Sequence, residues 1–363
     1  ESHRYRASAG VRAINELQPL LGLDFAVGST ELATSIGTNG KVSGEFKERY
    51  LKPAGLKLAA MLDARIGGLM KNGFHQIVGT PGTPPATFAD LLNAQVPMDR
   101  MSVPRDGQRM AAIEPGANAT IVAGLSGLFN NQSVLAEQYK TGIIKTGAGL
   151  DLAMSQNVPS HTVGPLGGTP LVNGANQGLT NAGATDNPFA NTTSLVTDGW
   201  TAAAAPRLAQ GDTFTINGVF SVNPETKAST GVLQSFLVTA AVSSDASGNA
   251  TVVISPAIIA GGAYQNVSAR PADNAAITVR TGTANTTYTQ NLIWHKDAIT
   301  LVSPEQSLPQ GMAVSTKSTL PGGGLSLRWV QGYDITNNRN INRLDVLWGA
   351  AVTLPNFGVR RTG

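Results

Sequence analysis

The chain has 363 residues, of which 41% are hydrophobic and 13% charged, and its formal net charge is +3. This length allows two or three domains with full cores, and the hydrophobic fraction excludes an intrinsically disordered chain. The net charge is too small for a dedicated nucleic-acid-binding protein, which carries a clustered basic stripe. The absence of cysteine excludes disulfides, thiolate metal sites and cysteine nucleophiles. No run approaches the ~18 apolar residues of a membrane span, so we expect no membrane partner.

The charged share is about half of the usual quarter of residues. Glycine occurs 41 times and proline 20 times. Small residues on a weakly charged surface suit a protein that is mostly covered by neighbouring molecules. A β-rich monomer with many glycine turns explains the same composition equally well, so both interpretations stay open at this point.

The first 42 residues are basic and irregular. Arg4, Arg6 and Arg12 make this start positive, and the segment beginning at Phe25 predicts one short strand. A flexible arm explains these features, and so does an arm with which a subunit contacts its neighbours.

Residues 43–72 predict the longest helix, and the rest of the chain is organised around it. Its apolar side chains recur every three or four residues, at Phe46, Tyr50, Ala54, Leu58, Met61, Leu62, Ile66 and Leu69. Ser43 is a favourable N-cap, and Asn72 followed by Gly73 ends the pattern. At 1.5 Å per residue the helix would be about 45 Å long. Pro53 either kinks one long helix or begins a second one at its first turn.

Mixed α/β structure is predicted after this helix. A short helix is expected at Phe88–Ala94, and a strand before a turn at Pro115–Gly116. A second helix is expected from Ala119 to Phe129, and a buried strand at Gly147–Met154. Together these segments indicate a layered α/β domain.

Residues 162–290 have almost no helical pattern. Short apolar runs alternate with turn residues, which predicts a small β-barrel or sandwich, while the Gly-, Asn- and Thr-rich stretch 166–198 predicts a long exposed loop. Strands return at 297–302, at 325–330 and from residue 342 onward. An all-β module inserted into a two-part domain is the simplest arrangement that explains this order.

The sequence contains no convincing catalytic constellation. Its histidines are isolated from one another, and we expect each to be a satisfied surface or core residue: His3, His75, His161 and His295. His295, Lys296 and Asp297 have the types for acid–base work, but adjacent residues of a strand point to opposite faces. HExxH, GxSxG and GxxxxGK[ST] motifs are all absent. We therefore predict no catalytic, cofactor or metal site, and Gly147–Gly149 lacks the third glycine of a dinucleotide loop.

Basic residues also occur at the C-terminal end, as Arg360 and Arg361. These arginines and those near the start are either ordinary solvated charges or contacts with anionic surfaces, such as acidic neighbours or nucleic acid.

Five segments, in order along the chain, form a recognisable set: Lys47–Ala60, Ile77–Phe88, Gln156–Gly164, Lys296–Pro304 and Val346–Ala350. In this order they resemble the P22-like major capsid (coat) proteins of tailed bacteriophages, within a similarity that extends from about Phe25 to Val352. The resemblance implies an α+β HK97-like capsid fold that carries an inserted all-β Greek-key barrel.

The resemblance also implies a division into domains. These would be an N-terminal arm with a shortened E-loop-like region (1–42), a peripheral domain (43–104) with a spine helix (43–72), an axial domain with closing peripheral strands (105–161 and 291–363), and the insertion domain (162–290). The family usually has a longer region before the spine helix, so contacts assigned to its E-loop are not carried over. The loop at 171–198 would touch neighbouring capsomers, and Asp186 and Asp198 are its acids.

By the resemblance, the function is a non-enzymatic subunit that self-assembles through hexamers and pentamers into an icosahedral shell around double-stranded DNA. Scaffolding, portal and decoration proteins are the expected partners, and the virion, assembled in the bacterial cytoplasm, is the expected location. An encapsulin-like compartment is one alternative, although such shells generally lack a β insertion. A β-rich adhesin is a second alternative, and it does not explain the long helix. An enzyme is a third alternative, but the sequence contains no convincing catalytic site to support it.

Overall fold

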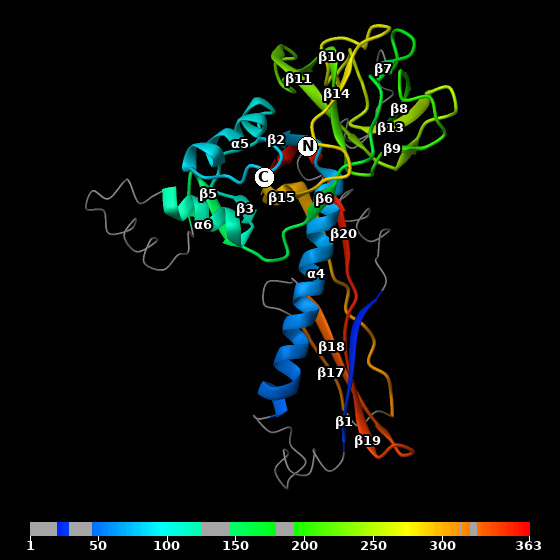
Figure 1. The fold of residues 1–363 in the computed structure, drawn as a ribbon. Coiled ribbons are helices and arrows are strands. Elements are labelled where there is room, and N and C mark those ends of the chain that lie inside the picture. Colours follow the sequence, from blue (N-terminus) through cyan, green and yellow to red (C-terminus); the bar gives the residue numbers. More distant parts are fainter. Residues whose placement is uncertain (1–19, 29–45, 125–145, 179–191, 312–313, 320–324) are drawn as a thin grey trace, which may run out of the picture. The chain divides into compact units, whose positions relative to one another are not determined.

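The computed structural model describes residues 20–28, 46–124, 146–178, 192–311, 314–319 and 325–363 (Figure 1). The chain divides into two compact units. Unit 1 consists of Glu1–Ile66 and Thr300–Ala351, and unit 2 of Gly67–Ile299 and Val352–Gly363. In the described part of the chain, no helix has the length and apolar character that crossing a membrane requires.

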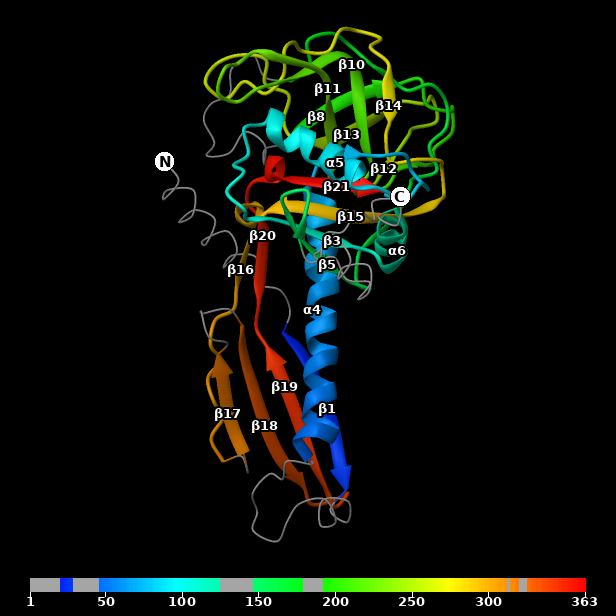
Figure 2. The ribbon, with the colours of Figure 1, turned by 90° about the vertical axis from the view of Figure 1, so that its left-hand side faces the viewer.

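Unit 1 contains a four-stranded antiparallel sheet (Figure 2). Its strand order is β1 (Leu21–Gly28), β19 (Arg339–Val346), β18 (Ser326–Asp334) and β17 (Val314–Thr319). The strand expected near Phe25 is therefore present, and it pairs with β19 along its whole length. The first part of the long helix packs beside this sheet, since the ring centroids of Phe46 and Trp329 are 6.4 Å apart.

The predicted long helix is confirmed in its described part. A π-helical turn (η1, Lys47–Leu51) leads directly into α4 (Lys52–Gly73). The amide N–H of Lys52 donates to the carbonyl of Lys47, five residues earlier, which widens the helix just before Pro53. Pro53 follows directly as the second residue of α4, and its ring is accommodated by this widened turn. The helix therefore continues past Pro53, and its hydrogen bonding changes there from π-helical to α-helical.

The central sheet of unit 2 is mixed, as expected for an α/β layer. Its strand order is β2 (Gln76–Val78), β21 (Gly358–Thr362), β15 (Thr287–His295), β3 (Arg109–Ile113), β5 (Leu150–Met154) and β4 (Thr146–Gly147), and β6 (Ser160–Thr162) pairs with β15 as well. The β2–β21 and β3–β5 pairs are parallel, and the other pairs are antiparallel. Gly147 belongs to the edge of this sheet, where a Cβ atom would lie 2.3 Å from Phe88, so close packing explains the glycine.

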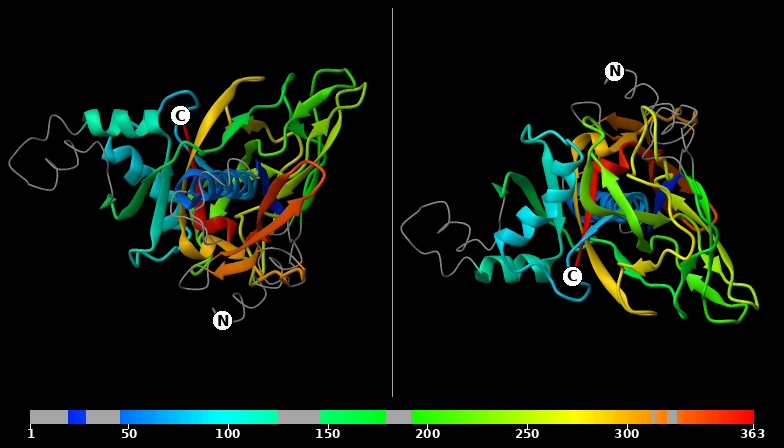
Figure 3. Two further views of the ribbon diagram at one scale, coloured as in Figure 1. Left: turned by 90° about the horizontal axis from the view of Figure 1, so that it is seen from below. Right: turned by 90° about the horizontal axis from the view of Figure 1, so that it is seen from above.

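Two helices of unit 2 share one hydrophobic core with this sheet. They are α5 (Phe88–Arg100) and α6 (Pro115–Gly124), and they lie together on the left in the view from above (Figure 3). Leu91, Ile121 and Ile293 belong to this core. Thr87 and Asp90 form a capping box that starts α5, and the helix continues beyond the expected end at Ala94.

The predicted turn at Pro115–Gly116 is wrong, because Pro115 begins α6 instead. Proline is favoured at the first position of a helix, where its fixed φ suits the helix and its N–H is not needed. The described part of this helix ends at Gly124, so the expected end at Phe129 lies outside the described residues.

The segment predicted to be all-β forms a sheet that closes on itself. The strand order is β14 (Ile277–Val279), β10 (Thr213–Val222), β11 (Ser229–Val238), β13 (Ala250–Ser255), β8 (Thr193–Asp198) and β7 (Leu171–Val172). An antiparallel bridge between Leu171 and Ala276 joins β7 back to the start of β14. All strand pairs in this ring are antiparallel, and Phe214, Phe236 and Ile254 are part of its buried core. Beside the ring, β9 (Pro206–Leu208) pairs with β12 (Val242–Ser243).

The expected long loop at 166–198 is wrong at both of its ends, since β7 and β8 are strands of this barrel. Residues 179–191 lie outside the described part. The barrel begins after β6 and ends before β15, and these two strands are paired at Thr162 and Thr287. The amide N–H of Val163 donates to the carbonyl of Thr286 at 3.0 Å. The chain therefore enters and leaves the barrel at neighbouring positions.

The last part of the chain forms the predicted strands, but these strands begin and end at other residues than expected. A 3₁₀ turn (η3, Lys296–Ala298) precedes β16 (Ile299–Val302), which pairs with β20 (Gly349–Val352). A second 3₁₀ turn (η4, Pro355–Phe357) precedes β21. The strand predicted from Asp297 thus begins only at Ile299.

Candidate functional site

A group of polar and charged side chains lies buried in unit 2 where the barrel segment meets the central sheet. We call Lys71, His161, Asp212, Thr281 and Arg360 the Asp212 cluster. Lys71 belongs to the last turns of α4, His161 to β6 and Arg360 to β21, while Asp212 directly precedes β10 and Thr281 follows β14. The side chains of Asp212 and Arg360 are 0% exposed. Five separate segments thus meet at one ionic centre.

The carboxylate of Asp212 accepts hydrogen bonds on both oxygens. Its Oδ1 lies 2.8 Å from Nε2 of His161 and accepts from the hydroxyl of Thr281 at 2.9 Å. Its Oδ2 accepts from the amide N–H groups of Gly164 at 3.0 Å and Ala209 at 2.8 Å. Burial alone would raise the pKa of Asp212, but these hydrogen bonds and the charge of His161 hold that pKa below its usual value. The carboxylate is therefore ionised at neutral pH.

The contact with Asp212 fixes the position of one proton of His161. An ionised carboxylate only accepts, so the Nε2 atom of His161 carries the proton that it shares with Asp212. Its Nδ1 atom lies 3.5 Å from Nζ of Lys71. Burial, followed by the nearby charge of Arg360, lowers the pKa of Lys71, and the charge of Asp212 opposes this shift.

Arg360 supplies the second buried cation of the cluster. Its Nη1 donates to the carbonyl of Gly211 at 2.8 Å, while Nε and Nη2 have no hydrogen-bond partner among the described residues. Burial lowers the pKa of Arg360 to about 10, against the opposing effect of Asp212, so the guanidinium stays charged at neutral pH. Gly211 has a φ of +96°, and a Cβ atom there would lie 2.9 Å from Oδ1 of Asn72 and 3.2 Å from Cε1 of His161. Only glycine fits this approach without strain.

The cluster is suited to fixing structure rather than to catalysis. Asp212, His161 and Arg360 are almost fully buried, so a substrate has no access to them. Among the described residues no group of His, Asp and Glu could hold a metal ion. A buried carboxylate with all its acceptors used specifies one geometry for the groups around it. The cluster therefore fixes the barrel segment onto the sheet of unit 2.

Both interpretations of Arg360 and Arg361 from the sequence are wrong, because these arginines are neither solvated nor available to an outside anion. Arg361 is 5% exposed, its Nη1 donates to the carbonyl of Thr83 at 3.3 Å, and its Nη2 lies 3.7 Å from Oδ1 of Asp90. Arg4, Arg6 and Arg12 lie outside the described residues.

The histidines differ from one another in their surroundings. His75, His161 and His295 are all buried, and His3 lies outside the described residues. Nε2 of His295 lies 3.1 Å from Oδ1 of Asp106, and its Nδ1 lies 3.7 Å from Oδ2 of Asp297. The strand expected from Asp297 is replaced here by the turn η3, and Asp297 lies beside His295 in this turn.

The two acids predicted for a loop contact have different outcomes. Asp186 lies outside the described residues. Asp198 is the last residue of β8 and pairs with Leu171, so its assignment to an exposed loop is wrong. Sequence patterns do not indicate a role for Asp212, which lies at the centre of the cluster. A single acid before a strand carries no local signal of burial, and its partners are far away along the chain.

We expect the stability of the folded chain to decrease as the pH falls from 6.5 toward 5. Burial, together with the charge of Arg360, lowers the pKa of His75 from 6.5 to about 3. Between these values the unfolded chain binds a proton at His75 and the folded chain does not, so each pH unit costs up to about 1.4 kcal/mol. Urea unfolding at several pH values measures the slope. A His75→Gln variant should show a clearly shallower slope, and an equal slope in both proteins contradicts this assignment.

Comparison with known proteins gives one family for the chain. The family model described as P22 coat protein, gene protein 5, matches residues 31–363. The comparison with curated proteins gave no match.

Three solved structures are similar to parts or most of the chain. A chain from Mycobacterium phage Che8 is 11% identical, with a TM-score of 0.39, over 95% of this chain and 71% of that chain. A chain from the capsid structure of the cyanophage P-SCSP1u is 12% identical, with a TM-score of 0.41, over 95% and 72%. The CUS-3 coat protein I-domain is 30% identical, with a TM-score of 0.23, over 31% of this chain and 96% of that chain. Because the family model covers most of its length, the chain belongs to the P22 coat protein family and is a phage major capsid protein, the subunit that forms the shell.

Proposed function

We propose that this capsid subunit has the HK97-like fold and builds an icosahedral shell around double-stranded DNA. In this proposal residues 43–104 form the peripheral domain, residues 105–161 and 291–363 the axial domain with closing peripheral strands, residues 162–290 a Greek-key insertion domain, and residues 1–42 the arm region. The observation that best supports it is the closed antiparallel barrel between the paired strands β6 and β15. An encapsulin-like compartment would not be expected to carry such an insertion.

We propose that the subunit has a purely structural role and catalyses no reaction. Contacts between identical copies, as hexamers and pentamers, hold the shell together, and a low share of charged residues suits faces that other copies cover. We further propose a scaffolding protein, a portal protein and a decoration protein as partners, non-specific contact with the enclosed DNA, and assembly in the bacterial cytoplasm. We also propose that Asp186 and Asp198 take part in contacts between neighbouring capsomers.

Electron microscopy of the purified chain, expressed with and without a scaffolding protein from the same phage, tests this proposal. Closed particles with five-fold and six-fold capsomers are the expected result. Dispersed monomers at high protein concentration under both conditions would contradict it.

A further inference from the structure

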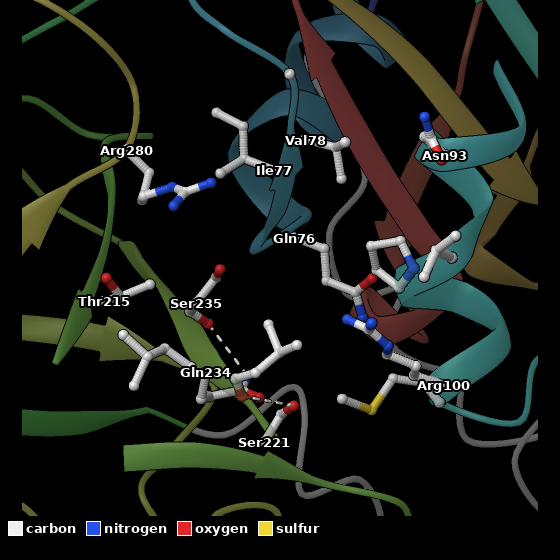
Figure 4. Close-up of a pocket in the computed structure, with 16 residues that line it drawn as sticks. Gln76, Ile77, Val78, Asn93, Arg100, Thr215, Ser221, Gln234, Ser235 and Arg280 are labelled. Atoms are coloured by element: carbon white, nitrogen blue, oxygen red, sulfur yellow. Dashed lines mark hydrogen bonds between the residues drawn. The ribbon is translucent and has the colours of Figure 1, made fainter. Parts of the chain in front are cut away.

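A pocket in unit 2 lies between the barrel and the edge of the central sheet (Figure 4). Its volume is about 370 Å³, within the range of about 300–1,000 Å³ that is usual for ligand sites. Residues of β2, the C-terminal part of α5, β10 and β11 line it. The pocket therefore belongs to one compact unit and is formed by elements that come from distant parts of the sequence.

The charge of this pocket is positive. Arg100 and Arg280 line it from opposite sides in Figure 4, and no acidic residue is among the lining residues. Both arginines are exposed, and neither guanidinium has a hydrogen bond or ion pair with a described residue. This differs from Arg105, Arg109 and Arg361, which all pair with carboxylates. Two unpaired cations around a concave surface favour an anionic ligand.

The pocket also exposes two strand edges. β2 is the outermost strand of its sheet in the described part of the chain. β11 pairs with β13 only at Leu237 and Val238, so its first half has no strand partner on that side among the described residues. Ile77 on β2, and Val232 and Leu233 on β11, line the pocket. Unpaired strand edges with apolar side chains favour an extended peptide, which adds main-chain hydrogen bonds along the edge.

Hydrogen bonds hold the walls of the pocket in place. Nδ2 of Asn223, in the turn between β10 and β11, donates to the carbonyl of Arg100 at 3.0 Å and to the hydroxyl of Ser102 at 3.3 Å. The Asp212 cluster fixes the same barrel segment to the central sheet. A site with fixed walls loses little conformational entropy when it binds, so the pocket is preorganised.

We propose that this pocket binds an extended acidic segment of a second copy of this chain. The inference rests on the function as a shell subunit, because a shell holds further copies next to every subunit. Each copy contributes 23 acidic residues, so carboxylates are available on its neighbours. Nucleic acid fits less well, since two arginines do not form a basic stripe and no aromatic residue lines the pocket for stacking on bases.

The absence of cysteine from the chain allows a direct test with single thiols. Val232 lines the pocket and is 42% exposed in the single chain. The Val232→Cys chain is assembled as a minority with the unsubstituted chain, and alkylation by iodoacetamide is timed before and after assembly. Assembly should slow alkylation of the Val232→Cys thiol by about tenfold, equivalent to about 1.4 kcal/mol of protection.

Neutralising the arginines shows whether charge causes the protection. Arg100→Gln and Arg280→Gln, added to the Val232→Cys chain, should remove most of this protection in shells that the unsubstituted majority still forms. A photo-crosslinker attached to the Val232→Cys thiol should capture a peptide of a second copy that contains Asp or Glu. Capture of DNA, or of another protein, overturns the proposed occupant.

The outcomes separate this inference from the proposed function. If the unsubstituted chain forms no shells, the function itself is wrong. If shells form but the Val232→Cys thiol reacts as fast as before assembly, or stays protected after both arginines are neutralised, only the acidic-segment proposal is overturned.

Discussion

Replacing Asp212 by alanine should destabilise the folded chain by about 3–5 kcal/mol, which is the range for removing one partner of a buried ionic group. The substitution leaves the buried cations Arg360 and Lys71 without the negative charge that opposes their pKa shifts. It also removes the acceptor for the hydroxyl of Thr281 and for two backbone N–H groups. Unpaired buried groups of this kind are costly because nothing replaces the water they lost.

Urea unfolding of the Asp212→Ala chain at pH 7 measures this effect. Asp151→Ala is the matched control, since Asp151 is exposed on β5 and its loss should change the free energy of unfolding by less than about 0.5 kcal/mol. Asp212→Asn keeps the shape of the side chain and should fall between the two. An Asp212→Ala chain that is as stable as the control would show that the buried contacts contribute nothing to the fold.

The second large effect is expected from removing the barrel. Joining Gly164 directly to Ala284 deletes the barrel at the point where the chain enters and leaves it, next to the β6–β15 pair. The remaining chain should aggregate and form no closed shells. The deletion removes Asp212, Thr281 and the Gly211 carbonyl together, so Arg360 and Lys71 lose the anion and the segment that cover them. Apolar side chains that face the barrel, such as Ile77, also become exposed to solvent.

A further substitution in the same deletion tests this reason. Arg360→Met combined with Lys71→Met replaces the two uncovered cations by apolar groups, and a smaller soluble fraction after centrifugation is expected than with the deletion alone. If the plain deletion is soluble and forms normal shells, the barrel is not needed for assembly. If the methionine substitutions increase solubility, uncovered charge rather than exposed apolar surface causes the aggregation.

Much of the fold could be predicted because its signals are local. The helix over residues 46–73 has a period of three to four apolar residues, and the barrel strands are short apolar runs between turn residues. Two of the errors of secondary structure have local causes. Pro115 reads as a turn residue, although proline also begins helices. Asp198 follows a Gly- and Asn-rich stretch, although it lies opposite Leu171 in an antiparallel strand pair.

The buried charges could not be predicted, because burial depends on contacts between distant segments. Arg360 and Arg361 are adjacent basic residues near an end of the chain, and such residues are usually solvated. Their burial requires β21 to lie between β2 and β15. Likewise, Asp212 becomes a central residue only when β6 and α4 meet the barrel segment. Sequence patterns indicate elements, whereas the ionic centre follows from their tertiary arrangement.

A reconstruction of assembled particles at side-chain resolution is the most direct test of the whole account. The account predicts closed shells in which every subunit carries a closed barrel between β6 and β15, with the carboxylate of Asp212 in hydrogen-bond contact with His161. Particles whose subunits hold this barrel elsewhere, or with Asp212 facing solvent, would contradict it.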